Sequence, residues 1–268
     1  MKFRAFFSRL MAALPNLKRL TASVLGGTWD VTLPCAALLL IMYLLDTVCA
    51  ANDSGAQMLV GLLMSIIVLP VAAGMITYAA GASWEGRRAT IVDAYHLARI
   101  RIKEIVITGL AAGAIVLIAN WLASFIYSLI GIVSALLGWL PVIGPVITAA
   151  VSAVFWLISL AMEFFAHIAL VIGMLSLTAD GVTGRAQAER ALSILRSGGD
   201  ELLCELGLVF LMWIAVQGVY ELAFLFAPLS GALACDALLA ALTAVSMVAV
   251  SVIYLRARDR QDGMRYHA

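Results

Sequence analysis

The stretch SGALACDALLAALTAVSMVAVSVIYL, Ser230 to Leu255, carries one charged side chain, Asp236, before a basic run begins at Arg256. A helix needs about 20 mostly apolar residues to cross a bilayer, because its backbone N–H and C=O groups must be satisfied within the segment. In the whole chain, 64% of the 268 residues are hydrophobic and 12% are charged, against about 45–50% and about 25% in soluble domains. The sequence therefore predicts an all-α, polytopic membrane protein.

Five further apolar stretches precede this one, so we expect six transmembrane helices. The predicted spans cover residues 32–50, 57–80, 105–130, 146–173, 203–227 and 230–255. The connections on one side are short, and those on the other side consist almost entirely of charged helical segments. We therefore expect residues 1–268 to form a single membrane domain, with no room for a soluble catalytic domain.

The N-terminal segment MKFRAFFSRLMAALPNLKRL begins like a signal peptide. Arg9 interrupts its apolar part, however, and no Ala-x-Ala cleavage site follows. Phe3, Phe7 and Leu14 belong to an apolar stripe with helical spacing, and the basic side chains lie off that stripe. We expect residues 1–30 to be retained as an amphipathic segment in the membrane interface.

The distribution of basic residues predicts the orientation of the chain. All 17 Lys and Arg residues fall in four places, namely the N-terminus, residues 87–103, residues 185–196 and the tail 256–265. Basic residues are retained on the cytoplasmic side of a membrane, so these four regions lie inside and the number of spans is even. We predict a protein of the bacterial inner (plasma) membrane with both termini cytoplasmic and the anionic cytoplasmic leaflet as its lipid partner.

Two charged segments about 97 residues apart resemble each other, GRRATIVDAYHLARI at 86–100 and TGRAQAERALSILRS at 183–197. Each predicts an amphipathic interfacial helix on the cytoplasmic side, leading into the next span. The N-terminal segment followed by two spans repeats this order, so three pseudo-repeated hairpins are expected. The basic residues predicted to meet the lipid surface are Arg87, Arg88, Arg99, Arg101, Lys103, Arg185, Arg190 and Arg196.

The stretch TADGVTGRAQAERALSILRSGGDELL, Thr178 to Leu203, resembles bacterial six-span proteins related to the membrane domain of glycerophosphoryl diester phosphodiesterases. The shared features are a small acidic-Gly turn, an Ala-Leu-x-x-x-Arg-Ser helix and the span that follows. The stretch GASWEGRRATIVDAYHLARI, 81–100, is similar to the middle repeat of that group. The resemblance implies a helical bundle. It implies no catalytic residue, because the phosphodiesterase activity of fused members belongs to a separate soluble domain.

Motifs of soluble enzymes are missing from the sequence. It contains no phosphate loop ending in Gly-Lys-Ser/Thr, no His-Glu-x-x-His and no Cys-x-x-Cys, and it has only three histidines. We therefore expect no metal, no haem and no other cofactor. The basic segments lack interleaved aromatic residues that would stack on bases, so no nucleic-acid partner is expected.

Five polar side chains interrupt the predicted spans and form a candidate intramembrane site. They are Asn120, Glu163, His167, Gln217 and Glu221. A charge near the centre of a span costs roughly 2.5–3.5 kcal/mol on insertion scales, so Glu163 needs a protonated state or a polar partner. His167 follows one turn later on the same face, and Asn120 is expected at a similar depth. These groups are either interhelical contacts or the pathway of a transporter.

Two cysteines, Cys49 and Cys235, fall near the predicted outer surface, where the compartment can be oxidising. They form either a disulfide that ties the first hairpin to the last or two small apolar residues at helix ends.

Small residues recur in GLAAG, Gly109 to Gly113, and small faces let helices approach closely in lipid. This face serves either internal packing or homodimerisation. Pro70 is expected to kink the second span, for packing rather than for gating.

We expect a non-enzymatic membrane protein with a structural, lipid-associated or assembly role, alone or in a homo-oligomer or membrane complex. The alternative is a small-solute or ion transporter or channel that uses Glu163 and the neighbouring polar groups. The two differ in whether polar side chains from separate spans converge at the midplane of the membrane.

Overall fold

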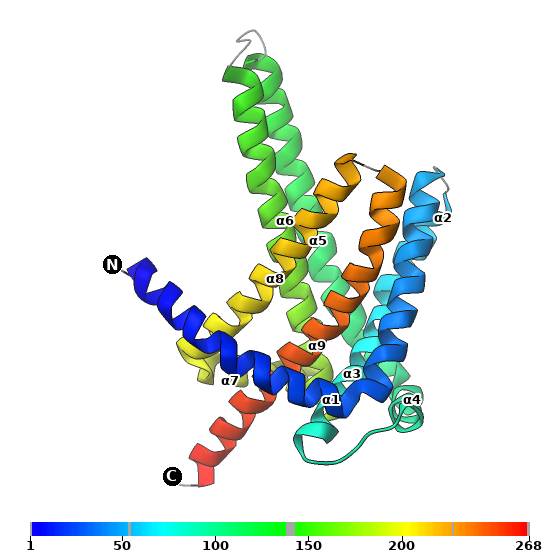
Figure 1. Ribbon diagram of the computed structural model, residues 1–268, viewed down its shortest axis with the longest axis vertical. Helices are drawn as coiled ribbons and strands as arrows, with labels where there is room; N and C mark the ends of the chain where they lie inside the picture. The colour runs from blue at the N-terminus through cyan, green and yellow to red at the C-terminus, as the bar shows by residue number, and fades with distance from the viewer. Residues whose placement is uncertain (1, 53–54, 138–142, 227, 267–268) are drawn as a thin grey trace. The chain divides into compact units, whose positions relative to one another are not determined.

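The computed structural model describes residues 2–52, 55–137, 143–226 and 228–266 (Figure 1). Within these ranges the chain is helical with short turns and contains no strand. The side chains at several helical positions, among them Asn120 and Glu221, lie outside the described residues. The helices are α1 (Lys2–Ala51), α2 (Ala56–Leu63), the π-helical segment η1 (Met64–Val68), α3 (Leu69–Trp84), α4 (Ile91–Ile100), α5 (Ile102–Leu137), α6 (Ile143–Thr178), α7 (Arg185–Ser197), α8 (Gly199–Phe226) and α9 (Pro228–Tyr266).

Five segments are long and apolar enough to cross a membrane. They are Met11–Ala51, Ala56–Trp84, Pro145–Thr178, Gly199–Tyr220 and Ser230–Gly263. The helical membrane class predicted from the sequence is therefore confirmed at this level. The predicted span 105–130 falls within α5, many of whose side chains lie outside the described residues, so the sixth span stays a prediction.

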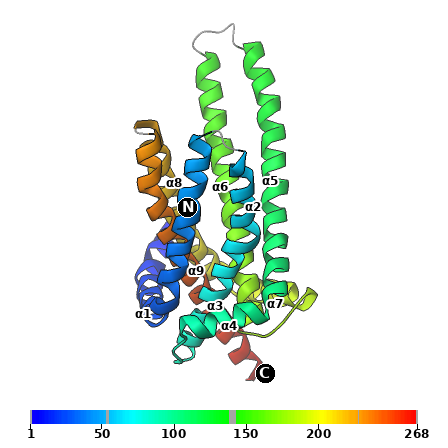
Figure 2. The same cartoon turned by 90° about the vertical axis from the view of Figure 1, so that its right-hand side faces the viewer.

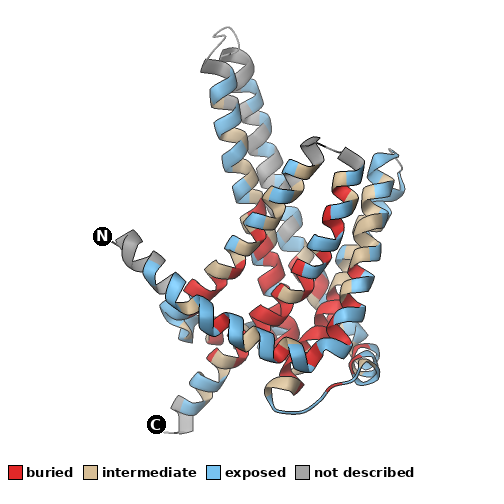
Figure 3. Ribbon diagram, viewed as in Figure 1, coloured by how far each residue is buried: buried red, intermediate tan, exposed pale blue. Residues whose placement is uncertain are grey.

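The chain divides into two compact units. Unit 1 contains Met1–Leu110 and Ile168–Ala268, and unit 2 contains Ala111–His167. In unit 1, α9 is the central helix and packs against α1, α3, α7 and α8. Its stretch Met247–Leu255 is buried throughout, as the red ribbon in Figure 3 shows. The hydroxyls of Ser246 and Ser251 donate to backbone carbonyls of the preceding turn, which lets polar residues pack in this core.

The predicted interfacial segment 1–30 and the predicted span 32–50 form one continuous helix, α1. Pro15 and Pro34 lie inside it. A proline removes one backbone hydrogen bond and clashes with the preceding turn, which bends a helix without ending it when tertiary contacts hold both halves. Figure 1 shows the resulting bend between the N-terminal arm of α1 and the half that rises toward α2.

The two charged helices α4 and α7 lie at one end of unit 1, and the end of α1 and the start of α2 lie at the other (Figures 1 and 2). Their buried faces are not equivalent in the 97-residue register. Helix α4 buries Ala94 and Ala98, whereas α7 buries Gln187 and Ile194. The repeat of the hairpins thus stays a prediction.

Helices α3 and α5 approach closely in unit 1 because each supplies a glycine to the other. A Cβ at Gly109 would lie 2.2 Å from Cγ of Pro70, and one at Gly74 would lie 3.0 Å from Cδ1 of Ile105. The face of α5 at Gly109 therefore packs against α3 within the same chain. Pro70 is the second residue of α3, two positions after the end of η1, where its missing N–H is tolerated.

Candidate functional site

Polar side chains from three elements meet at the charged end of unit 1. We call this group the Asp180 cluster; it contains Ser176 of α6, Asp180 in the turn after α6, Arg190 of α7, and Tyr254, Arg258 and Asp262 of α9. Gly181 and Gly184 have φ angles of 68° and 63°, a left-handed conformation that glycine adopts at low cost. These two glycines turn the chain sharply between α6 and α7 and leave Asp180 beside α9.

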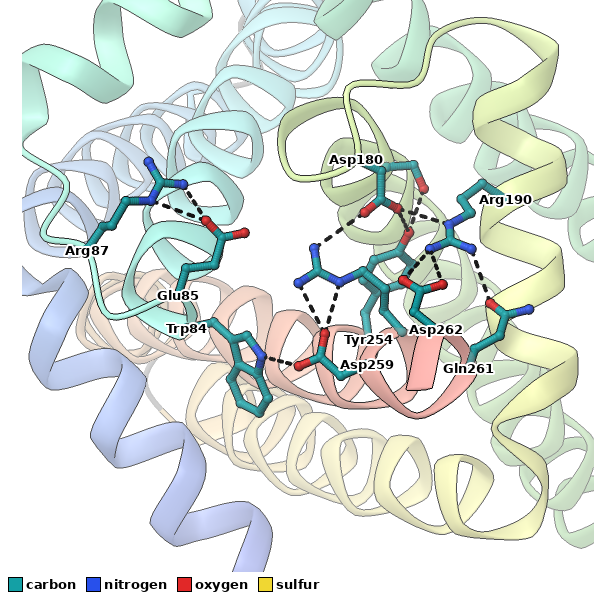
Figure 4. Close-up of polar contacts among 11 residues, drawn as sticks. Trp84, Glu85, Arg87, Asp180, Arg190, Tyr254, Asp259, Gln261 and Asp262 are labelled. Carbon is teal, nitrogen blue, oxygen red and sulfur yellow. Dashed lines mark hydrogen bonds and ion pairs between the residues drawn. The ribbon is translucent and has the colours of Figure 1, made fainter. Parts of the chain in front are cut away.

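Asp180 is the acceptor at the centre of the cluster (Figure 4). Its Oδ2 accepts from the Tyr254 hydroxyl at 2.7 Å and from Nε of Arg190 at 3.4 Å, and its Oδ1 lies 3.4 Å from Nη1 of Arg258. Because Tyr254 has one proton and donates it to Asp180, the Ser176 hydroxyl is the donor in the 3.0 Å contact with Tyr254. The Asp180 side chain is 9% exposed. Removal of this carboxylate would leave polar groups of two helices, α7 and α9, without their shared partner.

Arg190 links α7 to α9. Its Nη2 donates to both carboxylate oxygens of Asp262, at 3.1 and 3.0 Å, and its Nη1 donates to Gln261 at 3.3 Å. Partial burial alone lowers the pKa of Arg190, but the carboxylates of Asp262 and Asp180 outweigh it and raise the pKa. The side chain is 19% exposed. Arg190 thus forms its contacts within unit 1, where α7 packs on α9, and its predicted contact with the lipid surface stays a prediction.

Two further side chains, Trp84 and Gln187, hold this end of the unit together. Nε1 of Trp84, at the end of α3, donates to Oδ2 of Asp259 at 2.7 Å (Figure 4). Nε2 of the buried Gln187 donates to Thr108 of α5 at 3.1 Å and to the carbonyl of Gly173 of α6 at 2.6 Å. Helix α7 is therefore bonded to α5 and α6 through Gln187 and to α9 through Arg190.

A cavity of about 510 Å³ lies beside the cluster, where α7 ends, α8 begins and α9 continues past its apolar part. We call it the Glu205 cleft; it is lined by Ser197, Gly198, Leu202, Glu205, Ile253, Arg256, Ala257, Asp259, Arg260 and Gly263. The Glu205 side chain is 2% exposed and forms an ion pair with Arg256 through Oε1. Its Oε2 is buried and has no hydrogen-bond donor among the described residues.

Glu201, one turn before Glu205, completes the charge pattern of the cleft. Its carboxylate accepts from Nη1 and Nη2 of Arg260 at 2.5 and 3.1 Å, and it lies 3.7 Å from Nη2 of Arg256. Burying charges stabilises a protein only where every charged group has a partner. In this cleft, Oε2 of Glu205 is a buried charged oxygen that has no such partner among the described residues.

The other basic residues predicted to meet lipid lie at the surface. Arg87 pairs with Glu85, Arg88 with Asp30 and Arg185 with Glu189, all in exposed positions where an ion pair contributes little. Arg99, Lys103 and Arg196 are exposed, and Arg101 is half-buried; these four form no ion pair with any described residue.

The described residues do not test the predicted intramembrane site. Glu163 and His167 both lie on α6 in unit 2, where Glu163 is half-buried and His167 is buried. Gln217 lies on α8 in unit 1 and is half-buried. The side chains of Asn120 and Glu221 lie outside the described residues. The convergence of these five groups stays a prediction.

The four cysteines are free thiols in this structure. Cys49 on α1 is half-buried and Cys235 on α9 is buried, and these two helices pack against each other. Alkylation with and without a reductant, followed by peptide mass spectrometry, tests the predicted bridge. Equal labelling of both thiols without reductant would contradict it.

Sequence reasoning missed the Asp180 cluster and the Glu205 cleft. Two signals were present: Glu205 is a carboxylate inside the predicted span 203–227, and the tail after Leu255 alternates basic and acidic residues within a continuing helix. Neither signal predicts which residue each charged side chain pairs with. The pairing of Glu205 with Arg256 depends on the packing of α8 against α9.

No protein-family model, curated protein or solved structure matches the chain. The resemblance to six-span proteins related to glycerophosphoryl diester phosphodiesterases therefore stays a prediction. Among the residues that the structure describes, no group of three or more His, Cys, Asp or Glu side chains is placed to hold a metal ion.

Proposed function

We propose that this protein is a non-enzymatic component of the bacterial inner membrane that binds the anionic cytoplasmic leaflet with its charged end. Its role is structural, lipid-associated or in assembly. The observation that carries the proposal is a division among the basic side chains. Arg190 and Arg256 are paired internally, whereas Arg99, Lys103 and Arg196 are exposed and form no ion pair with described residues.

The internal pairs support this role because they hold α7 and α9 in place while leaving other bases of the same end for lipid. A Lys or Arg close to an anionic leaflet contributes about 1 kcal/mol to membrane attraction, and salt screens the effect. Three such bases would therefore contribute about 3 kcal/mol. The exposed apolar side chains on α4, among them Val92 and Tyr95, suit a helix that lies in the interface.

The proposal is tested with the full-length protein in nanodiscs that contain either zwitterionic lipid alone or an added fraction of phosphatidylglycerol. We expect the anionic lipid to raise the thermal stability at low salt, and we expect the triple variant Arg99→Gln, Lys103→Gln, Arg196→Gln to lose most of this gain. Arg185→Gln is the control, because that side chain is already paired with Glu189. Unchanged stability and oligomeric state in discs without anionic lipid would contradict the proposal.

A further inference from the structure

The Glu205 cleft has polar groups at its base and an apolar wall. Glu205 and Arg256 supply the buried polar part, and Arg260, whose side chain is 53% exposed, lies toward solvent. Leu202, Ile253 and Ala257 form the apolar wall. The cavity volume of about 510 Å³ falls in the range of sites for small ligands, about 300–1,000 Å³.

The unpartnered Oε2 of Glu205 sets the first requirement for a ligand. Oε1 of this carboxylate is already paired with Arg256, and Oε2 is buried without a donor among the described residues. A buried acceptor without a donor destabilises the protein, and a charged acceptor does so most strongly. A ligand that brings an N–H or O–H group to Oε2 removes this cost. An ammonium group does so best, because it also carries the opposite charge.

The charge balance of the lining sets the second requirement. The lining contains two carboxylates, Glu205 and Asp259, and two guanidinium groups, Arg256 and Arg260. A third carboxylate, Glu201, pairs with both of these arginines. A ligand with a net negative charge is therefore disfavoured. A zwitterion suits the cleft if its cation reaches Glu205 while its anion lies near Arg260 and the start of α8, where a helix N-terminus favours negative charge.

The position of the cleft sets the third requirement. It is lined by residues from α8 and α9, at the ends of two segments that are apolar enough to cross a membrane. Leu203, next to the lining residue Leu202, is 62% exposed. A ligand with an apolar tail can leave that tail in lipid while its head group enters the cleft.

From these three requirements we propose that the Glu205 cleft binds a phosphodiester with a primary ammonium group, and that its source is the head group of an ethanolamine-type phospholipid. This inference rests on the proposed membrane function and names a lipid class for it. The ammonium donates to Oε2 of Glu205, and the phosphodiester lies at Arg260. A choline head group has no N–H and cannot satisfy Glu205, so methylation of the amine abolishes the fit.

The test uses the full-length, delipidated protein in detergent and measures lipid binding by native mass spectrometry and by thermal shift. The probes are phosphatidylethanolamine, phosphatidylcholine and phosphatidylglycerol with the same acyl chains, together with soluble glycerophosphoethanolamine. We expect at least tenfold tighter binding of phosphatidylethanolamine than of either other lipid. Glu205→Gln should remove this preference, whereas the control Glu189→Gln, on the exposed side of α7, should keep it.

A second variant guards against a folding defect in Glu205→Gln. Gly263 lines the cleft, and a Cβ at this position would meet no atom within 4 Å. Gly263→Leu should therefore fill the cleft without disturbing the ion pairs, and we expect it to lose phosphatidylethanolamine binding at wild-type thermal stability. Equal binding of the ethanolamine and choline lipids by the wild type, or unchanged binding by Gly263→Leu, would overturn the proposal.

The source of the head group is decided by the soluble probe. Binding of phosphatidylethanolamine with at least tenfold weaker binding of glycerophosphoethanolamine supports the lipid as the source. Equal affinities would overturn the lipid source and assign the same head-group chemistry to a soluble ligand. The residues tested for anionic-lipid binding, Arg99, Lys103 and Arg196, do not line the cleft, so failure of one proposal is distinguishable from failure of the other.

Discussion

Substitution of Gly109 by alanine tests how α3 and α5 pack. The added Cβ would lie 2.2 Å from Cγ and 2.8 Å from Cβ of Pro70. Carbon atoms in contact prefer a separation of about 3.5–4.0 Å, so the helices must separate by about 1.3 Å or more. The pyrrolidine ring cannot rotate out of the way as a flexible side chain would. Separation at this point also loosens the contact of Ile105 with Gly74, one turn away.

The expected cost follows from two opposing effects. Overpacking of a well-packed core costs about 1–3 kcal/mol, whereas replacing glycine with alanine in a helix gains about 0.5–1 kcal/mol. We therefore expect Gly109→Ala to lower the free energy of unfolding by about 1 kcal/mol from the middle of these ranges, and by about 2.5 kcal/mol at most. Gly113→Ala is the matched control on the same helix, because a Cβ there would meet no atom within 4 Å. It should be neutral or slightly stabilising.

The assay is unfolding of the purified protein by SDS in mixed micelles, followed by circular dichroism. Gly109→Ala should unfold at a lower SDS fraction than the wild type, and Gly113→Ala should not. The reverse order would refute the packing argument. It would mean that the open part of the small face, around Gly113, is covered by another partner such as a second copy of the chain.

Three further predictions concern the charged end and the orientation. Asp180→Ala should lower the free energy of unfolding by about 1.5–3 kcal/mol, the range for hydrogen bonds to a charged group. The control Glu189→Ala removes an exposed ion pair with Arg185 and should change the free energy of unfolding by about 0.5 kcal/mol or less. Equal effects of the two substitutions in SDS unfolding would contradict this prediction. In the capping box of α4, the Thr90 hydroxyl and backbone N–H donate to Asp93 and lower the pKa of its carboxyl. The charged carboxylate therefore stabilises the folded protein above the unfolded pKa of about 3.9, and this stabilisation is lost as the pH falls through the lower folded pKa. In unfolding compared at pH 6 and pH 3, Thr90→Ala should reduce the loss of stability on acidification; the same loss as in the wild type would count against the cap. In intact cells, a cysteine introduced at position 230 should react with a membrane-impermeant thiol reagent and one at position 186 should not, and labelling at 186 would reverse the predicted orientation.

Long-range pairing explains why the sequence located the charged helices but not the site. Helix α7 was predicted at 185–196 and is observed at Arg185–Ser197, because its charged, helix-forming residues stand between two turns rich in glycine. Arg190 and Arg196 look alike in that sequence. One is paired inside with Asp262 and the other is exposed, and this difference arises from the face of α7 that packs on α9.

By itself, the sequence determined that this protein is helical and apolar enough to lie in a membrane, and it placed the charged helices between long apolar stretches. Those properties follow from composition and from the local cost of unsatisfied backbone groups in lipid. Only the tertiary structure decided that Pro70 packs on Gly109, that Tyr254 donates to Asp180, and that Glu205 meets Arg256 with one oxygen left unpaired. Each of these contacts joins residues far apart in the chain. Their existence depends on how helix faces are matched in packing, which no local pattern of residues specifies.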